Sequence, residues 1–222
     1  MVLLFDIDGT LIKTGGAGVT ALMSAFSDLF RVAEPCEVPF SGRTDRWIAH
    51  RLFRAHDIDD TDANWQRLQD EYLRRLAVYL PQREGMVLPG VTGLLNQLSQ
   101  RDDVALGLLT GNSRGSAKLK LDHYRLSHYF AFGGYGDHFV NRDDVARDAL
   151  TASCTHIGQE VPPDRVWVIG DTPIDVRCAR AIGARAVAVA TGWDSREQLV
   201  AAAPDLVLDS LDPADAFLQL LG

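Results

Sequence analysis

Short, almost uninterrupted apolar runs recur along this chain and constrain its fold more than any other feature. They span residues 2–7, 104–110, 166–170, 186–190 and 206–208. Apolar residues that follow one another without polar alternation are typical of strands buried on both faces of a parallel sheet. The sequence therefore predicts a parallel β-sheet whose strands come from both ends of the chain.

Helical patterns separate the later runs. Apolar residues recur at the spacing of one helix face in residues 89–100 and again in residues 142–157. Strands that alternate with helices form βαβ units, in which helices cover both faces of the sheet. We therefore expect an α/β fold with a three-layer α/β/α core.

The first two strong strands are separated by about ninety residues, whereas a connection in such a fold usually spans about two to six. Residues 19–80 are helical in pattern, and glycines flank them on both sides. We expect an inserted all-helical module at residues 15–85. The catalytic core is then discontinuous and comprises residues 1–14 and 86–222.

Charge and cysteine content narrow the class of protein. The net charge of −8 over 222 residues argues against nucleic acid and anionic membranes as partners. The three cysteines form no CxxC pair, which disfavours a zinc site or a disulfide framework. The N-terminal apolar run is interrupted at Asp6 and is too short for a signal peptide or a membrane span. We expect a cytoplasmic protein.

Polar residues follow three of the predicted strands. They are Asp6 and Asp8, then Thr110, Gly111 and Asn112, and finally Asp171 and Asp175. Ligands of open parallel sheets bind beyond the carboxyl ends of the strands, so one site is expected here. Two like charges 4 Å apart cost about 4 kcal/mol at an effective dielectric constant near 20. We therefore predict that Asp6, Asp8, Asp171 and Asp175 hold a hard cation, Mg²⁺, with Asp8 contributing its backbone carbonyl.

This set of residues suits phosphoryl transfer. Asp6 is the predicted nucleophile that forms an aspartyl-phosphate, and Asp8 the general acid and base. Thr110, with backbone N–H groups near Gly111, would hold phosphate oxygens. Simpler roles stay open, because Thr110 could cap the next helix and Asp175 could complement a helix dipole.

Three segments, DIDGT, LLTGN and IGDTPID, resemble motifs I, II and IV of the haloacid dehalogenase superfamily. The tail ATGWDSREQL resembles that of phosphoglycolate-phosphatase-like members. The resemblance implies a Rossmann-like core, Mg²⁺ dependence, an aspartate nucleophile and a C1-type helical cap at residues 15–85. The second aspartate of motif I points to a phosphatase or a phosphomutase.

One motif departs from the pattern of the family. A lysine usually precedes motif IV, but this chain has no lysine between residues 121 and 170. The segment NRDDV resembles a variant with arginine in that place, so we assign Arg142, with Asn112, Thr110 and Gly111, to phosphate binding. Lys120 is the competitor, yet it lies almost three helical turns beyond Thr110, about 15 Å at 1.5 Å per residue. That distance favours Arg142.

The loop SGRTD at residues 41–45 resembles the cap loop that points at the active site in related phosphatases, so Arg43 is the predicted cap contact to the substrate. The expected partner is a small phosphorylated metabolite, and the expected state is a monomer or a homodimer. The leading prediction is a Mg²⁺-dependent phosphatase. A phosphomutase of the β-phosphoglucomutase type and a non-catalytic binding protein remain alternatives, and a nicotinamide oxidoreductase is disfavoured because the GxGxxG fingerprint is missing.

Overall fold

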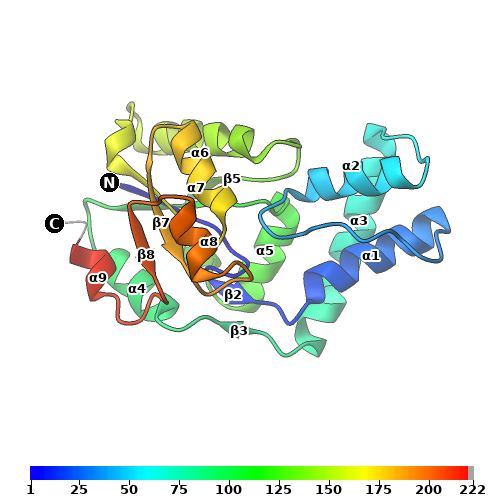
Figure 1. The fold of residues 1–222 in the computed structure, drawn as a ribbon, viewed down its shortest axis with the longest axis horizontal. Helices are drawn as coiled ribbons and strands as arrows, with labels where there is room; N and C mark the ends of the chain where they lie inside the picture. Colours follow the sequence, from blue (N-terminus) through cyan, green and yellow to red (C-terminus); the bar gives the residue numbers. More distant parts are fainter. Residues whose placement is uncertain (220–222) are drawn as a thin grey trace.

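The computed structural model describes residues 1–219 of the chain. Its main sheet has six parallel strands in the order β5-β4-β1-β6-β7-β8. Figure 1 shows this sheet in one half of the molecule, with helices on both of its faces. The strands are β1 Val2–Phe5, β4 Ala105–Leu109, β5 Phe132–Gly134, β6 Val166–Gly170, β7 Arg185–Val189 and β8 Leu206–Leu208, with a separate antiparallel pair of β2 Ile12–Lys13 and β3 Met86–Val87. The predicted parallel α/β fold is confirmed.

Helices occupy most of the remaining chain. They are α1 Ala17–Phe30, α2 Asp45–Ala55, α3 Asp62–Tyr79, α4 Val91–Leu98, α5 Arg114–His123, α6 Arg142–Ile157, α7 Pro173–Ala181, α8 Arg196–Ala201 and α9 Asp215–Leu218, with short 3₁₀ helices at Leu80–Gln82, Ser127–Tyr129 and Pro163–Arg165. At the start of six of them a side-chain oxygen accepts a hydrogen bond from a backbone N–H group, and these oxygens belong to Thr44, Thr61, Ser113, Asn141, Thr172 and Ser195. Such caps satisfy donors that have no partner within the helix. No helix among the described residues is both long and apolar enough to cross a membrane.

Both faces of the sheet are buried, which explains the continuous apolar runs. In β1, Leu3 and Phe5 point to a cluster that includes α4 and α5, whereas Val2 and Leu4 point to a cluster that includes α6 and α7. Alternate residues of one strand therefore supply two separate cores, and no position is left for a polar side chain.

Strand β5 was missed because its sequence, FGG, has neither length nor β-branched residues. The glycines allow close packing instead. A Cβ atom at Gly134 would lie 2.4 Å from the carbonyl oxygen of Val145 in α6, so that helix approaches the strand more closely than a side chain would permit. The two-residue strands β2 and β3 also escaped prediction.

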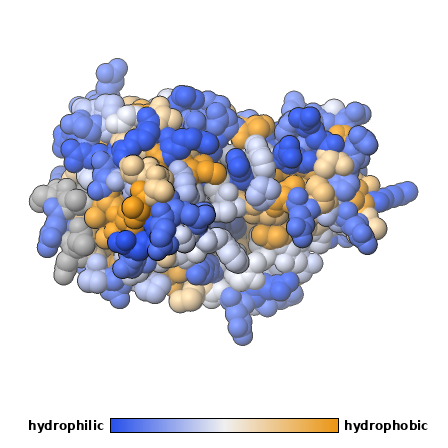
Figure 2. Space-filling view, in the orientation of Figure 1, coloured by the Kyte–Doolittle hydropathy of each residue, from blue (hydrophilic) through white to orange (hydrophobic). Residues whose placement is uncertain are grey.

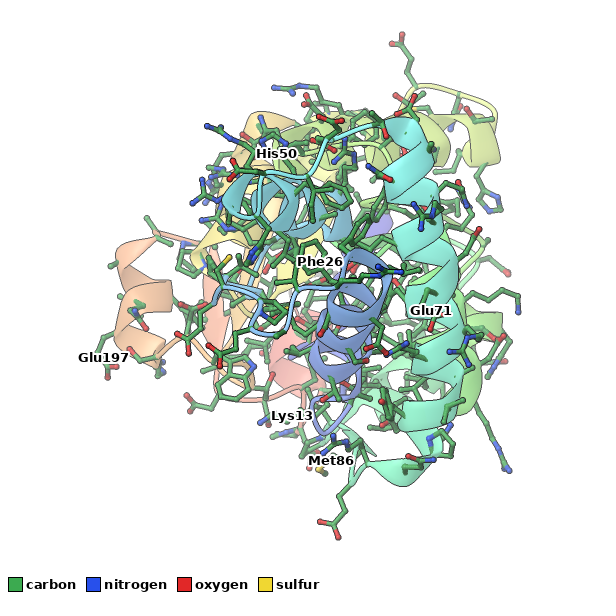
Figure 3. All side chains as sticks on the ribbon, turned by 90° about the vertical axis from the view of Figure 1, so that its right-hand side faces the viewer. Lys13, Phe26, His50, Glu71, Met86 and Glu197 are labelled. Carbon is green, nitrogen blue, oxygen red and sulfur yellow. The ribbon has the colours of Figure 1, made fainter. Side chains whose placement is uncertain are left out.

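Helices α1, α2 and α3 form a group with its own hydrophobic cluster, separate from the two clusters beside the sheet. Figure 3 looks onto these helices, with Phe26 between them. The chain enters and leaves the group side by side, because Lys13 of β2 pairs with Met86 of β3 (Figure 3). Helices α1, α2 and α3 thus lie between β2 and β3 along the chain, and the division into a module at residues 15–85 and a discontinuous core stays a prediction.

Candidate active site

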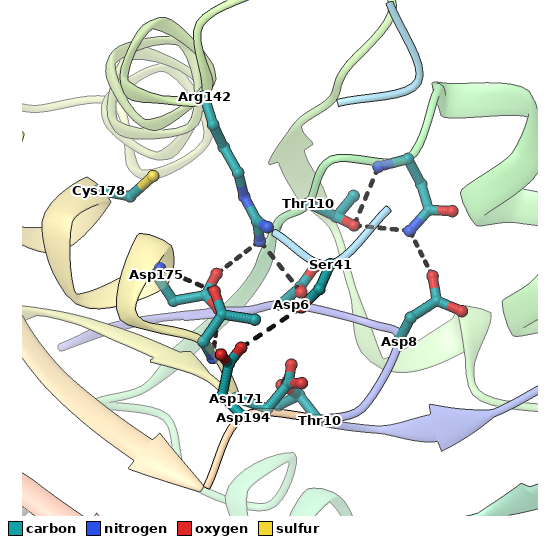
Figure 4. A network of polar contacts seen from close by, with 12 residues as sticks. Asp6, Asp8, Thr10, Ser41, Thr110, Arg142, Asp171, Asp175, Cys178 and Asp194 are labelled. Atoms are coloured by element: carbon teal, nitrogen blue, oxygen red, sulfur yellow. Dashed lines mark hydrogen bonds and ion pairs between the residues drawn. The ribbon is translucent and has the colours of Figure 1, made fainter. Parts of the chain in front are cut away.

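Three aspartates meet at the carboxyl edge of the sheet. Asp6 follows β1, Asp171 follows β6, and Asp175 lies in the first turn of α7. One carboxylate oxygen of each lies within 4.8 Å of the others, and all three side chains are buried (Figure 4). Strands β1 and β6 are neighbours in the sheet, which brings together residues that are more than 160 positions apart.

Arg142 is the cation inside this group. It is the first residue of α6, and its Nη2 donates to Asp175 Oδ1 at 2.5 Å and lies 3.0 Å from Asp6 Oδ2 (Figure 4). Three buried carboxylates therefore face one buried guanidinium. The Nε of Arg142 is buried without a hydrogen-bond partner among residues 1–219. The structure thus brings Arg142 to the predicted nucleophile.

The excess of negative charge in this group shifts the pKa values of its members. Burial, together with Asp175, raises the pKa of Asp6 to about 6, although Arg142 opposes the shift. Burial and the charges of Asp175 and Asp6 hold the pKa of Asp171 well above its ordinary value. Burial lowers the pKa of Arg142, but the neighbouring Asp175 and Asp6 outweigh it and the net shift is upward. A bound cation would relieve the remaining repulsion.

Asp175 serves two neighbours at once. Its Oδ2 accepts the N–H and the hydroxyl of Thr172, at 3.0 and 2.7 Å, in a capping box at the start of α7. Its Oδ1 accepts from Arg142. The carboxylate of Asp175 therefore both caps the start of α7 and orients Arg142.

Asp8 faces away from the three carboxylates. Its side chain is 41% exposed, and its Oδ2 accepts from Asn112 Nδ2 at 2.8 Å and from Lys120 Nζ at 2.6 Å. Lys120 Nζ also donates to Asn112 Oδ1 at 2.6 Å. Asp8 thus lies at the cavity with a cation and an amide beside it.

The expectation that Lys120 lies about 15 Å from the site was wrong. Helix α5 begins only at Arg114, so a rise counted from Thr110 is too long. Side chains of a helix also lean toward its N-terminus, and the long lysine stem spans the remaining distance. Arg142 and Lys120 therefore both reach the site, the first at Asp6 and the second at Asp8.

Thr110 does not cap α5, because Ser113 does. The fully buried hydroxyl of Thr110 accepts from the backbone N–H and the Nδ2 of Asn112, at 3.3 and 2.9 Å (Figure 4). Its own hydroxyl hydrogen is available for a further acceptor. Gly111 uses its carbonyl oxygen to accept the N–H of Asp45 at 2.8 Å.

Two glycines leave room around Asp171. A Cβ atom would lie 2.2 Å from Asp171 Oδ2 at Gly9, which has φ +85°, and 1.6 Å from it at Gly192. Only residues without a side chain fit there. Thr10 Oγ1 donates to Asp171 Oδ1 at 3.0 Å. The open cradle, the all-oxygen donors and the unbalanced charge fit a hard divalent cation.

A cavity of about 480 Å³ lies above these residues, between the sheet edge and helices α1–α3. Figure 2 shows the surface hollowed between the two halves of the molecule. Asp6, Asp8, Asn112 and Asp171 line its floor, and Arg43 lines it from the helical side. The predicted cap residue is thus placed at the same cavity, away from the carboxylate cluster. The guanidinium of Arg43 stacks 4.5 Å from the ring centroid of Trp47.

Asp45 was missed as a functional candidate, although it lies in the quoted SGRTD segment. It is the first residue of α2, and its buried Oδ2 accepts from Ser113 N at 2.7 Å and Ser116 Oγ at 2.9 Å. Burial raises the pKa of Asp45, and the charge of Lys120 opposes the shift. It joins the helical group to the start of α5. Such a tertiary contact leaves no periodic trace in the sequence.

Comparisons with known proteins agree with this geometry. The family described as haloacid dehalogenase-like hydrolase matches residues 3–189. The phosphoglycolate phosphatase of Synechococcus elongatus is 31% identical over 215 residues, which cover 96% of this chain and 93% of that protein. The phosphoglycolate phosphatase of Rhodospirillum rubrum is 30% identical, with 93% and 86% covered.

Solved structures share the fold. A hydrolase from Pseudomonas syringae superposes with a TM-score of 0.74 at 23% identity and covers 99% of this chain and 98% of its own. CbbY from Rhodobacter sphaeroides, solved with phosphate, gives a TM-score of 0.73 at 20% identity, with 96% and 95% covered. The chain belongs to the haloacid dehalogenase-like hydrolase family, and within it is a phosphatase.

Proposed function

We propose that this enzyme hydrolyses a small-molecule phosphate monoester through an aspartyl-phosphate on Asp6. The observation that carries the proposal is that two carboxylates close together in the sequence have different surroundings. Asp6 is buried against Arg142, whereas Asp8, two residues on, is half-exposed at the cavity beside Lys120. One carboxylate is held in place by its neighbours, and the other can exchange protons with a ligand in the cavity.

In the first step, a carboxylate oxygen of Asp6 attacks phosphorus and the bond from phosphorus to the alcohol oxygen breaks. Protonated Asp8 gives its proton to the departing oxygen. In the second step, Asp8 takes a proton from water, the water oxygen attacks phosphorus, and the bond to Asp6 breaks. Phosphate leaves, and both aspartates return to their starting forms.

The remaining residues bind and orient. Thr110, Gly111 and Asn112 lie where β4 ends and supply hydroxyl, backbone and amide donors toward phosphate oxygens. Arg142 holds Asp6 and Asp175 in place, and its free Nε is a further donor. Lys120 positions Asp8. We assign the role of the missing lysine to Arg142, because it contacts the nucleophile itself.

We propose Mg²⁺ as the cation held by Asp6, Asp171 and Asp175, with the backbone carbonyl of Asp8. When bound, it supplies positive charge that neutralises phosphate oxygens. Residues 15–85 are proposed to act as a cap that excludes water, on a core of residues 1–14 and 86–222. Arg43 is its proposed contact to the substrate.

The test is phosphate release from a panel of esters that begins with phosphoglycolate, the substrate named for two relatives. We expect release that needs Mg²⁺, stops with chelator and is lost in Asp6→Asn. Asp209→Asn is the matched control, because Asp209 lies in an exposed ion pair with Arg196. Release that survives in Asp6→Asn would contradict the proposal. Conversion of a sugar phosphate to its isomer, without release, would show a phosphomutase.

A further inference from the structure

The cavity has a polar floor and an apolar wall. The floor carries the carboxylates at the strand ends, whereas the helical side carries mostly hydrocarbon. The apolar lining comprises Ile12, Val19, Leu22, Phe40, Ile48, Tyr72 and Trp193. Five of the seven come from residues 15–85, whereas Ile12 lies in β2 and Trp193 in the loop after β7. A wall of this composition binds hydrocarbon better than hydroxyl or charge.

We propose that the substrate is a phosphate monoester whose organic group is apolar and distinctly larger than glycolate. The inference rests on the proposed phosphatase function and adds the class of alcohol. Phosphoglycolate has nine non-hydrogen atoms, which at the roughly 30 Å³ of a liquid water molecule occupy at most about 270 Å³. The cavity measures about 480 Å³, so a substantial part of it is left for a larger group.

The leaving group departs toward this wall. Asp8, the proposed proton donor, lies 2.6 Å from Lys120 Nζ. A Cβ atom at Gly18, in the first turn of α1, would lie 3.4 Å from that Nζ and 3.7 Å from the Tyr72 hydroxyl. Helix α1 therefore passes directly beside Lys120, the side chain that contacts the proposed proton donor. An alcohol that leaves from Asp8 meets the helix that carries Val19 and Leu22.

Two wall residues are exposed in a way that favours an apolar ligand. The side chain of Val19 is 44% exposed and that of Trp193 is 93% exposed. Large apolar side chains exposed at the rim of a cavity cost free energy until something covers them. A flat or branched hydrocarbon on the substrate would cover both.

Two polar side chains on the helical side of the cavity, those of Asp45 and Ser41, are already engaged. Asp45 accepts from Ser113 and Ser116, and Ser41 Oγ donates to Asp194 Oδ2 at 3.4 Å. The hydroxyls of a sugar would find these partners occupied. The Nε of Arg43 is buried without a hydrogen-bond partner among residues 1–219, and Arg43 is the group on which a small anionic substrate would depend.

The size of the cavity does not come from separation of the helices from the sheet. Trp65 Nε1 donates to the carbonyl of Asp137 at 3.1 Å, and Gln69 Nε2 donates to its Oδ1 at 3.1 Å. The N–H of Asp45 donates to the carbonyl of Gly111 at 2.8 Å. These bonds tie α2 and α3 to the core while the cavity keeps its volume.

The experiment compares four esters of primary alcohols, so that the leaving groups are chemically alike. They are 2-phenylethyl phosphate, ethyl phosphate, phosphoglycolate and glucose 6-phosphate. We expect kcat/KM for the phenylethyl ester to exceed that for each of the others by roughly tenfold or more, since burial of a ring is worth about that factor. Equal or better turnover of phosphoglycolate, lost in Arg43→Met, would overturn the inference and leave the phosphatase intact.

Substitutions test whether the preference for the larger ester comes from the apolar wall. Val19→Trp fills the wall from an exposed position, and we expect it to lower kcat/KM for the phenylethyl ester by about fivefold more than it lowers kcat/KM for ethyl phosphate. Val78→Trp is the control, because Val78 is 47% exposed on α3 and does not line the cavity. Equal losses for both esters in Val19→Trp, or the same loss in Val78→Trp, would contradict the assignment.

Measurements of binding alone test the apolar site independently of the proposed phosphatase activity. 2-Phenylethylphosphonate and ethylphosphonate cannot be hydrolysed, so calorimetry on the wild-type protein with Mg²⁺ reports affinity alone. We expect the larger phosphonate to bind roughly tenfold more tightly. Tighter binding without turnover of any ester would refute the phosphatase and keep the apolar site. Equal binding of the two phosphonates would refute the apolar site, whatever is hydrolysed.

Discussion

The floor and the wall of the cavity are built by different means. On the floor, charged groups hold one another in place, as Asp6 and Asp175 hold Arg142. On the wall, residues such as Val19 and Trp193 have much of their surface exposed. A change on the floor therefore unbalances several groups, whereas a change on the wall alters only what fits. The chemistry depends on the floor, and the choice of substrate depends on the wall.

The largest expected effect is on the floor. Asp6→Asn keeps the size of the side chain but removes the nucleophilic oxygen, so we expect kcat to fall by about 10³-fold or more. Phosphate release under saturating substrate measures it. Binding of a phosphonate should survive in this variant, and loss of both binding and turnover would indicate damage to the site rather than loss of a nucleophile.

Arg142→Met should cost the most stability. It leaves three buried carboxylates without their guanidinium, and breaking a buried ion pair typically costs about 3–5 kcal/mol. Urea unfolding measures the change. Mg²⁺ should raise the unfolding midpoint of Arg142→Met more than that of the wild type, because the cation replaces part of the lost charge. An equal or smaller shift would argue against a cation site among these carboxylates.

Asp45→Ala tests the joint between the two regions. The Ser113 N–H and the Ser116 hydroxyl lose their acceptor, and we expect a loss of about 1–3 kcal/mol in the free energy of unfolding. Asp45→Asn keeps an acceptor oxygen and should lose less. If both variants unfold like the wild type, the contact does not join the helices to the core.

The smallest effect is expected on the outer surface of the helical group. Hydrogen bonds from Arg74 and Arg75 lower the pKa of Glu71 from 4.5 to about 2. A lowered folded-state pKa stabilises the protein above pH 4.5, and this contribution disappears as the pH falls toward 2. Because the group is near the surface, Glu71→Gln should cost less than about 1 kcal/mol at pH 7. The difference from the wild type should shrink at pH 3, and a difference that grows would contradict the assignment.

The sequence predicted site residues best where their place after a strand determines their place in the fold. Asp6 and Asp171 were predictable because both end buried parallel strands, whose carboxyl ends share one edge. Strand β5 was not predictable, since Gly134 fits the close approach of α6 and Gly133 lies against Leu108 of β4, and neither glycine favours a strand by propensity. Resemblance to a family, rather than physical reasoning, drew attention to Arg142.

Side-chain reach and contacts between helices and sheet were the weak points. Lys120 was placed too far away because the helical rise was counted from Thr110 instead of Arg114, and the lysine stem was ignored. The role of Asp45 depends on Ser113 and Ser116 at the start of α5, a contact that the spacing of residues cannot reveal.

The most direct test of the account is to identify the covalent intermediate. The enzyme is mixed with Mg²⁺ and a phosphate ester, quenched during turnover and treated with borohydride, which reduces an acyl phosphate to an alcohol. We predict that peptide mass spectrometry finds residue 6 converted from aspartate to homoserine, only when the ester is present. Rapid phosphate release with Asp6 unmodified, or reduction at another carboxylate, would contradict the central claim that Asp6 is the nucleophile.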